Sequence, residues 1–252
     1  MDPSNDHERA IKAAIDTIAA EGRLSLASSI PELAASLQFV MSRSDSEFLV
    51  QYLLWRMDQP RTFSVMDSRT ASILANPPYH SHVVYPYTND QHLVDAVGFY
   101  TASGLDRGGA VILITTEAHR SAIKRYLKSD GHVEVLEASG QLSFLDAAEL
   151  MSTFMVDGNP DPKIFKVGIR TLIEQASRDE RTGRNREVRL FGEMVSLLWP
   201  INTPAAERLE ELGNEVIEEY SIPILCAYSL NGPGRSQLPE SLIKAHSHSI
   251  AN

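Results

Sequence analysis

The sequence is poor in cysteine, with Cys226 alone among 252 residues. One thiol excludes an internal disulfide framework and a metal site built from a cysteine cluster, and it fits a reducing compartment. Long apolar runs are also missing, because AVILI at 110–114 and PILCAY at 223–228 are far too short to span a bilayer. The amino terminus, MDPSNDHERA, lacks the basic start and apolar run of a secretory signal. We therefore expect a cytoplasmic protein without membrane contact.

The dipeptide Gly-Lys occurs nowhere in the chain. A phosphate-binding loop needs the pattern GxxxxGK[ST], because its backbone N–H groups must approach the phosphates closely and its lysine must reach them. Hydrolysis of ATP by such a loop is thus excluded. We expect a protein that binds and signals rather than an enzyme, with no catalytic residues, no cofactor and no metal.

A net positive charge is also absent, since 23 Lys and Arg stand against 33 Asp and Glu and the formal net charge is -10. A surface of this sign repels phosphate backbones and anionic lipids, which argues against direct nucleic-acid binding. Residues 1–75 carry seven Lys and Arg against ten Asp and Glu. A DNA-binding helix needs a basic face, so we expect this segment to serve dimerisation or partner docking, with a homodimer as one outcome.

The hydrophobic pattern divides the chain into two regions. Residues 8–58 have the spacing of short amphipathic helices, and the break ANPPYHSH places a boundary between residues 70 and 80. Apolar β-rich runs then alternate with amphipathic helices, which predicts a mostly parallel sheet flanked by helices. The expected domains are a helical region at 1–75, an α/β domain at 79–232 and a flexible tail at 233–252.

The expected elements of the α/β domain follow from these runs. Strands are predicted at 82–87, 110–115, 132–136, 188–194 and 222–228. Helices are predicted at 90–104, 117–128, 146–156, 161–178 and 204–220, with Gly104, Gly131 and Gly158 at helix ends.

Ligands of open α/β sheets sit beyond the carboxyl ends of the strands. The loops expected there contain most of the candidate ligand-binding residues, and Trp199 is a candidate for closing the pocket. The candidates are Tyr85, Tyr87, Thr88, Glu117, His119, Arg120, Glu193 and Trp199. Among them Glu193 lies inside an otherwise apolar predicted strand, where a carboxylate needs partners.

Each candidate also has a purely structural interpretation. Tyr85 and Tyr87 alternate on a strand and could pack beneath a helix, and Glu193 could belong to an ion pair. The pair His80 and His82 has metal-binding spacing but no third ligand at a fixed distance in sequence. Cys226 lies in an apolar strand, where we expect inert packing.

Four ordered blocks make the resemblance to a known family specific. HVVYPYTNDQHLVDAVGFYTASGLDRGGAVILITTEAHRSAI, GQLSFLDAAELMSTFMVDGNPD, VRLFGEMVSLLW and LCAY together resemble the MEDS family, the methanogen/methylotroph DcmR sensory domains, over about residues 79–230.

The resemblance implies a RecA/KaiC-like fold with a degenerate phosphate loop, in proteins joined to DNA-binding or histidine-kinase modules. It implies sensing of a small ligand or partner, with a histidine kinase or transcription regulator as output. Two alternatives stay open: a residual nucleotide-binding ATPase, and an interaction protein acting as an antagonist in a kinase or sigma-factor pathway. Family membership does not carry over a ligand.

Overall fold

The computed structural model describes residues 68–127, 132–179, 183–231 and 235–250. They lie in the second of two compact units, residues 65–252, the first being residues 1–64. The helices expected at 8–58 lie outside the described residues. Helix α4 (Ser68–Ala75) belongs to the second unit, so this unit begins earlier than the expected boundary between residues 70 and 80.

A six-stranded sheet forms the centre of the second unit, in the order β3-β2-β6-β7-β1-β8 with every pairing parallel. Its strands are β1 (His82–Tyr87), β2 (Ala110–Thr115), β3 (Leu142–Asp146), β6 (Val188–Gly192), β7 (Ile224–Ser229) and β8 (His248–Ser249). Every residue of β2 and β6 is buried. Such strands need cover on both faces, which helices provide.

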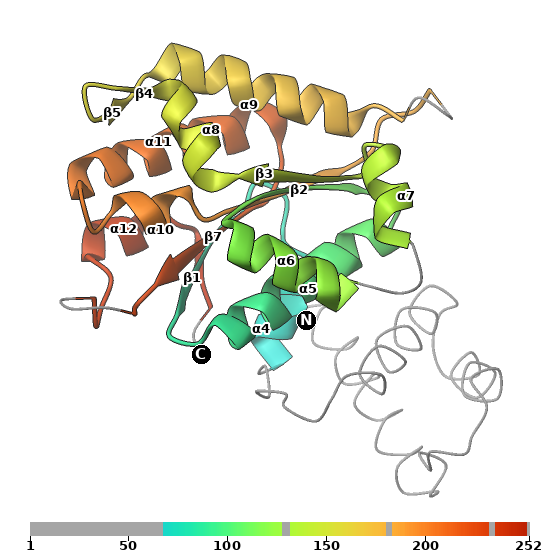
Figure 1. Cartoon of the computed structure of the whole chain (residues 1–252), viewed down its shortest axis with the longest axis horizontal. Coiled ribbons are helices and arrows are strands. Elements are labelled where there is room, and N and C mark those ends of the chain that lie inside the picture. Colours follow the sequence, from blue (N-terminus) through green and yellow to red (C-terminus); the bar gives the residue numbers. More distant parts are fainter. Residues whose placement is uncertain (1–67, 128–131, 180–182, 232–234, 251–252) are drawn as a thin grey trace, which may run out of the picture. The chain divides into compact units, whose positions relative to one another are not determined.

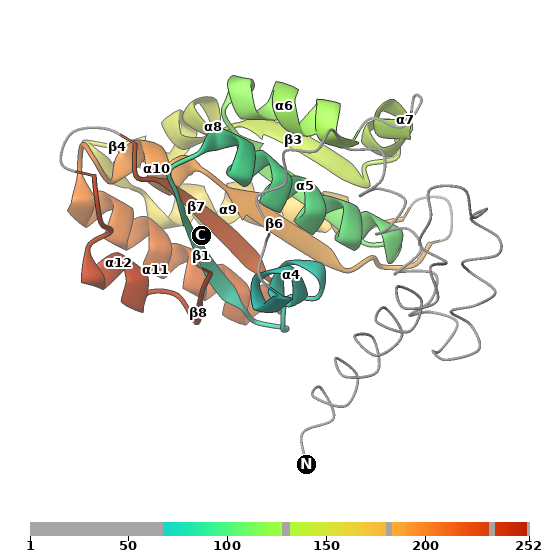
Figure 2. The same ribbon diagram turned by 90° about the horizontal axis from the view of Figure 1, so that it is seen from below.

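Two layers of helices cover the sheet (Figures 1 and 2). One layer contains α4, α5 (Asp90–Asp106) and α6 (Glu117–Leu127). The other contains α8 (Ala147–Phe154), α9 (Pro162–Ser177), α10 (Met194–Leu198), α11 (Thr203–Tyr220) and α12 (Glu240–Lys244). Helix α7 (His132–Ala138) packs beside β3, and β4 (Met155–Val156) forms a short antiparallel ladder with β5 (Asn159–Pro160). This confirms the predicted α/β class and is consistent with a RecA-like fold.

The predicted strand at 132–136 is wrong, because this segment forms α7. Val133 and Leu136, three residues apart, are buried, whereas Val135 is 63% exposed. A helical spacing of apolar residues therefore overrides the alternation that suggested a strand. The third strand is instead β3, between the predicted elements. The helix predicted at 146–156 is shorter, since Asp146 is the N-cap of α8.

Two glycine assignments also change. Gly104 lies inside α5, where an added Cβ would approach the Arg189 side chain to 2.9 Å, so close packing explains this glycine. Gly158 has φ +78° but lies in the turn between β4 and β5 rather than at a helix end. Gly131 is outside the described residues.

Much of the expected flexible tail is folded. Residues 240–244 form α12, and β8 pairs with Val83 and Val84 of β1. Ile250 is 2% exposed. The prediction of a flexible tail is therefore wrong for the described residues after 235, because backbone pairing with β1 orders a segment whose polar composition gave no such signal.

Arg189 connects α4 to the sheet. Its guanidinium donates to the carbonyl oxygens of Leu74, Ala75 and Tyr100 at 3.0–3.3 Å, and it lies over the Tyr100 ring at 5.4 Å. Burial lowers the pKa of this guanidinium. The two α4 carbonyls are groups that the end of a helix leaves without partners, so a strand side chain caps this helix. None of the described helices has the length and apolar character needed to cross a membrane.

Candidate functional site

The carboxyl ends of β1, β2 and β6 meet at one edge of the sheet, where Glu193 follows β6. The sequence placed Glu193 inside this strand, but β6 ends at Gly192 and Glu193 is the N-cap of α10. Its carboxylate reaches back toward β2. Oε2 accepts hydrogen bonds from the Thr115 hydroxyl at 2.5 Å and the Thr116 backbone N–H at 2.9 Å.

The second oxygen of Glu193 contacts α6. His119 Nδ1 lies 2.5 Å from Glu193 Oε1, and the exposed fractions of the two side chains are 13% and 1%. A buried carboxylate is tolerated only when its oxygens are hydrogen-bonded. Here a hydroxyl, an amide and an imidazole satisfy it, and together they join β6, β2 and α6.

The hydrogen bond to Glu193 raises the pKa of His119, and burial only partly opposes it. Asp90 also favours the cationic imidazole, since its Oδ1 lies 3.8 Å from Nε2. The three groups come from α6, the end of β6 and the start of α5. The raised pKa of His119 favours its charged form, so the strength of this contact depends on pH.

Tyr87 contacts His119. Its ring meets His119 edge-on, with centroids 6.1 Å apart. Burial and the negative charge of Glu193 raise the pKa of Tyr87, so its hydroxyl stays protonated. Tyr87 is only 3% exposed, so it is a neutral, buried aromatic residue packed against His119.

The connection between β1 and α5 holds only Thr88 and Asn89. The Asn89 side chain accepts hydrogen bonds from the Gln91 and His92 backbone N–H groups, and Asp90 adds a negative charge. A bound phosphate needs such N–H groups at a helix start. This connection thus lacks both the length and the donors of a phosphate loop.

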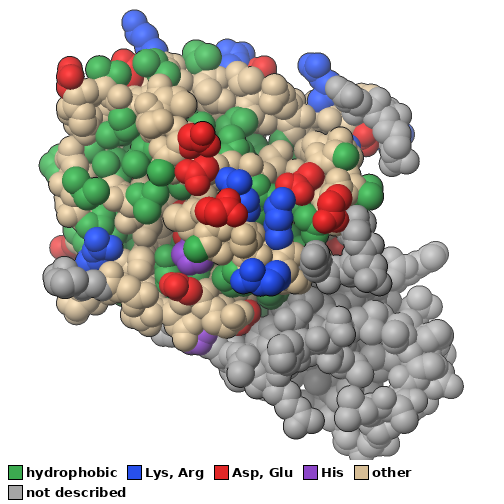
Figure 3. All heavy atoms as spheres, in the orientation of Figure 1, with side chains coloured by type: hydrophobic (Ala, Val, Ile, Leu, Met, Phe, Trp, Pro, Cys, Tyr) green, Lys and Arg blue, Asp and Glu red, His purple; other side chains and the backbone are tan. Residues whose placement is uncertain are grey.

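Three further predicted residues, Thr88, Glu117 and Arg120, lie just before α5 and in the first turn of α6. Thr88 is exposed. Glu117 begins α6, and 70% of its side chain is exposed; it lies 3.3 Å from Arg120 Nη1 and accepts a hydrogen bond from Ser121. Acidic and basic side chains intermix over the α6 and α7 part of the surface in Figure 3. The surface around the first turn of α6 is therefore polar.

The structure does not bring Tyr85 or Trp199 into contact with Glu193 or His119. Tyr85 is 2% exposed and its hydroxyl donates to the His92 carbonyl at 3.4 Å, beneath α5. Trp199 packs on Tyr228 in the core of the opposite face, with ring centroids 6.5 Å apart. Their contacts are those of core residues.

Thr115, Thr116 and Asp90 complete the group, although the sequence did not select them. Two hydroxyl residues directly after the apolar run AVILI were the available signal. Hydroxyl groups at a strand end are common, so only the position of Glu193 in space distinguishes these residues. We call Asp90, Thr115, Thr116, His119 and Glu193 the Glu193 group.

Comparison with known proteins adds one match. The family model described as MEDS, the MEthanogen/methylotroph, DcmR Sensory domain, matches residues 81–247, about two thirds of the chain. No curated protein matches the sequence. The matched range contains the whole Glu193 group.

Proposed function

Because the chain belongs to the MEDS family of sensory domains, we propose that it is a non-catalytic regulatory protein that recognises a small ligand or a partner at the Glu193 group. The output partner is a histidine kinase or a transcription regulator, and the site of action is the cytoplasm. Residues 1–75 transmit the signal.

The observation that carries this proposal is the bridge made by Glu193. One carboxylate holds the end of β2 through Thr115 and Thr116, and holds α6 through His119. A ligand that takes over one of these contacts stabilises a different placement of α6 relative to β6. Differential affinity for two such arrangements is what a sensor requires.

The β1–α5 connection supports a role without catalysis. Two residues separate the elements, and Asn89 already occupies the N–H groups that a nucleotide phosphate needs. Asp90 at the start of α5 repels a phosphate further. Binding without phosphate transfer is the function this edge supports best.

The chemistry of the group also limits the ligand. Glu193 and Asp90 are acceptors, and a carboxylate exchanges its partners only for other hydrogen-bond donors. Amines and alcohols therefore fit better than phosphates or carboxylates.

The test uses the purified full-length chain with four probes: methylammonium, ethanolamine, inorganic phosphate and Mg-ATP. We expect the two amines to raise the unfolding temperature, phosphate and Mg-ATP to leave it unchanged, and no inorganic phosphate to be released. Asp90→Asn, an exposed change, should weaken the response to amines. Glu174→Gln on the surface of α9 is the matched control and should retain it.

Two results would contradict the proposal. Magnesium-dependent phosphate release that Glu193→Gln abolishes and Glu174→Gln retains would favour the residual ATPase. A response to amines that persists in Asp90→Asn and His119→Gln would place recognition elsewhere. If no probe acts but a co-purified protein shields His119 from chemical modification, the partner form of the proposal is supported.

A further inference from the structure

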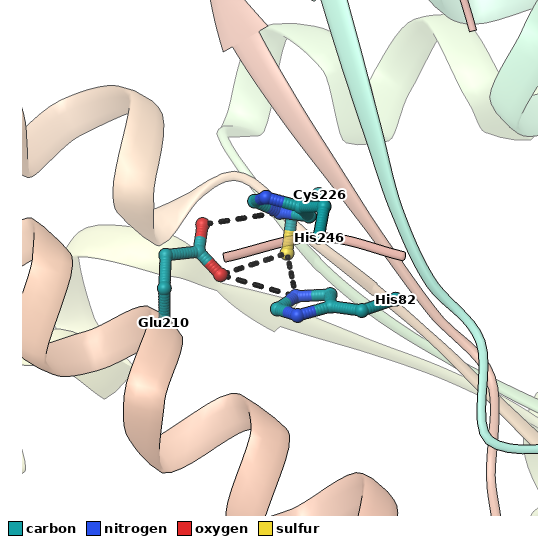
Figure 4. A group of neighbouring side chains, drawn as sticks. All are labelled: His82, Glu210, Cys226 and His246. Atoms are coloured by element: carbon teal, nitrogen blue, oxygen red, sulfur yellow. Dashed lines mark hydrogen bonds and ion pairs between the residues drawn. The ribbon is translucent and has the colours of Figure 1, made fainter. Parts of the chain in front are cut away.

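Four potential metal ligands converge inside the protein, away from the Glu193 group (Figure 4). They are His82 at the start of β1, Glu210 on α11, Cys226 on β7 and His246 after α12. The side chains of His82, Glu210 and His246 are at most 2% exposed, and Cys226 is 6% exposed. The fold therefore gathers residues up to 164 positions apart into one buried cluster, which we call the His82 cluster.

The distances within the His82 cluster suit one small cation. His82 Nε2 lies 3.0 Å from Glu210 Oε2 and 3.3 Å from Cys226 Sγ, and Sγ lies 3.8 Å from the same oxygen. His246 Nε2 lies 3.5 Å from Glu210 Oε1, and all four ligand atoms are within 4.8 Å of one another. Tetrahedral zinc with bonds of 2.0–2.3 Å separates its ligand atoms by roughly 3.3–3.8 Å.

Hydrogen bonds on the far side of each imidazole orient its lone pair. His82 Nδ1 lies 2.9 Å from Asn214 Oδ1, and Asn214 Nδ2 donates to the Ala245 carbonyl, which fixes the amide. His246 Nδ1 lies 2.7 Å from the Leu242 carbonyl oxygen. Because a carbonyl oxygen only accepts, each Nδ1 carries the proton and each Nε2 faces the cluster with a lone pair. Histidines that bind metals are held in this way.

One of these lone pairs is without a partner. His246 Nε2 is buried and has no hydrogen-bond partner in the part of the chain that the structure describes. The nearest carboxylate oxygen, Glu210 Oε1, already accepts a hydrogen bond from the Tyr228 hydroxyl. A buried polar atom of this kind points to a ligand, and it is aimed at the centre of the cluster.

The charge of the cluster leads to the same conclusion. Glu210 is buried, and among the described residues the neutral imidazoles of His82 and His246 lie within 3.5 Å of its carboxylate, with no lysine or arginine paired to it. A divalent cation would compensate the carboxylate and a Cys226 thiolate together. Without it, three lone-pair donors and a carboxylate face one another.

The same residues contain a chain from Cys226 through His82 to Asn214, an order found in thiol nucleophiles. Two features exclude that use. The adjacent cavity has a volume of about 40 Å³, and apart from His82, Glu210 and Cys226 it is lined by apolar residues and glycines. A substrate of ordinary size therefore does not fit. The carboxylate of Glu210 also opposes the thiolate that a nucleophile needs.

We propose that His82, Glu210, Cys226 and His246 bind one zinc ion with tetrahedral geometry. Nitrogen, sulfur and carboxylate ligands together suit zinc and exclude calcium and magnesium, which take oxygen ligands. Four protein ligands make the site a closed one that joins the segment after α12 to β1, β7 and α11. This proposal differs from the expectation of no metal and of an inert Cys226.

His80 provides an internal control. The sequence pairs it with His82 as HxH, but His80 is exposed and has φ 60°, whereas His82 is buried at the start of β1. His80 is not among the converging ligands. Its substitution should therefore leave the metal in place.

The experiment uses the full-length chain purified without a polyhistidine tag from zinc-supplemented cells. We expect one zinc per chain by elemental analysis. Apoprotein prepared with a chelator should bind one zinc in competition with a chromophoric chelator. Cobalt in place of zinc should give the thiolate-to-metal charge-transfer band and visible bands of a tetrahedral sulfur-ligated ion.

Variants assign the ligands. Cys226→Ser should abolish the charge-transfer band, and His246→Gln should weaken zinc binding at least about a hundredfold, because loss of an outer partner alone costs 10–100-fold. Asn214→Ala should weaken it within that outer-partner range. His80→Gln should match the wild type. Circular dichroism confirms folding, and if a variant is unfolded, the wild-type stoichiometry and cobalt spectrum decide.

Two outcomes would overturn the proposal. Wild-type protein could contain no zinc and bind none in the apoprotein titration. Alternatively, zinc affinity could be unchanged in folded Cys226→Ser and His246→Gln but reduced in His80→Gln, which would place the metal on the surface. Either result leaves the Glu193 group and its proposed role untouched.

Discussion

His119 Nδ1 lies 2.5 Å from Glu193 Oε1, although 74 positions separate the two residues in the sequence. This contact links the first turn of α6 to the end of β6, across β2. The contact raises the pKa of His119, so the link weakens as pH rises through that raised pKa.

The contribution of His119 to stability should fall as pH rises. The contact raises the pKa of His119 above its ordinary value of 6.5, so its stabilisation is complete below about 6.5 and is lost as pH rises through the folded-state pKa. Glu193, Asp90 and Tyr87 are the groups that face it. Urea unfolding measures the difference in unfolding free energy between the wild type and His119→Gln. This difference should be about 1–2 kcal/mol larger at the low-pH end of this window than at the high-pH end. Parallel profiles for the two proteins would rule this out.

The packing of α5 against α6 should leave no space for a side chain at position 98. An added Cβ would come within 2.3 Å of the Tyr126 ring, so Gly98→Ala should destabilise the protein by about 1–3 kcal/mol. Gly168 in α9 has open space around the same position. Gly168→Ala should therefore stabilise the protein by about 0.5–1 kcal/mol. Denaturant midpoints measure both, and equal effects of the two changes would contradict the packing argument.

Removal of the Arg189 guanidinium should loosen α4. Arg189→Met leaves the carbonyls of Leu74, Ala75 and Tyr100 without a donor, at a cost of about 2–4 kcal/mol. Hydrogen exchange should accelerate over residues 68–75 more than over the strands. Arg170→Met, at an exposed position of α9, is the control and should change little. Unchanged exchange in α4 would show that this helix is held by other contacts.

The start of α5 should depend on Asn89. Asn89→Ala removes the acceptor for the Gln91 and His92 N–H groups and should cost about 1 kcal/mol. Thr88→Ala, at the exposed neighbouring position, should cost less than about 0.5 kcal/mol. Thermal unfolding compares the two variants. A larger effect at Thr88 would mean that the connection is held by contacts other than the helix cap.

Local pattern predicted much of the fold. The strands at 82–87 and 110–115 agree with the structure in both bounds because each is an apolar run with polar residues after it. HVEVLEA failed because its apolar residues satisfy both the strand and the helix spacing. β8 was missed because its order comes from backbone pairing with β1, which leaves no mark on the local composition.

The sites show the same division. Glu193 was identifiable because a single acid interrupts an apolar block. Trp199 was a candidate for closing the pocket, but it packs on Tyr228 in the core. The His82 cluster was not predictable, since positions 82, 210, 226 and 246 have no motif spacing and become neighbours only when α11, α12 and three strands are assembled.

The shortest strand of the sheet has the largest consequence for handling the protein. β8 pairs with the outer backbone of β1 at Val83 and Val84. Deletion of residues from 240 onward would therefore expose the unpaired edge of β1, a strand of buried apolar residues. Such edges recruit strands from other molecules. A variant that lacks residues 240–252 should therefore self-associate, because the carboxyl-terminal segment protects the edge of β1 from pairing with other molecules.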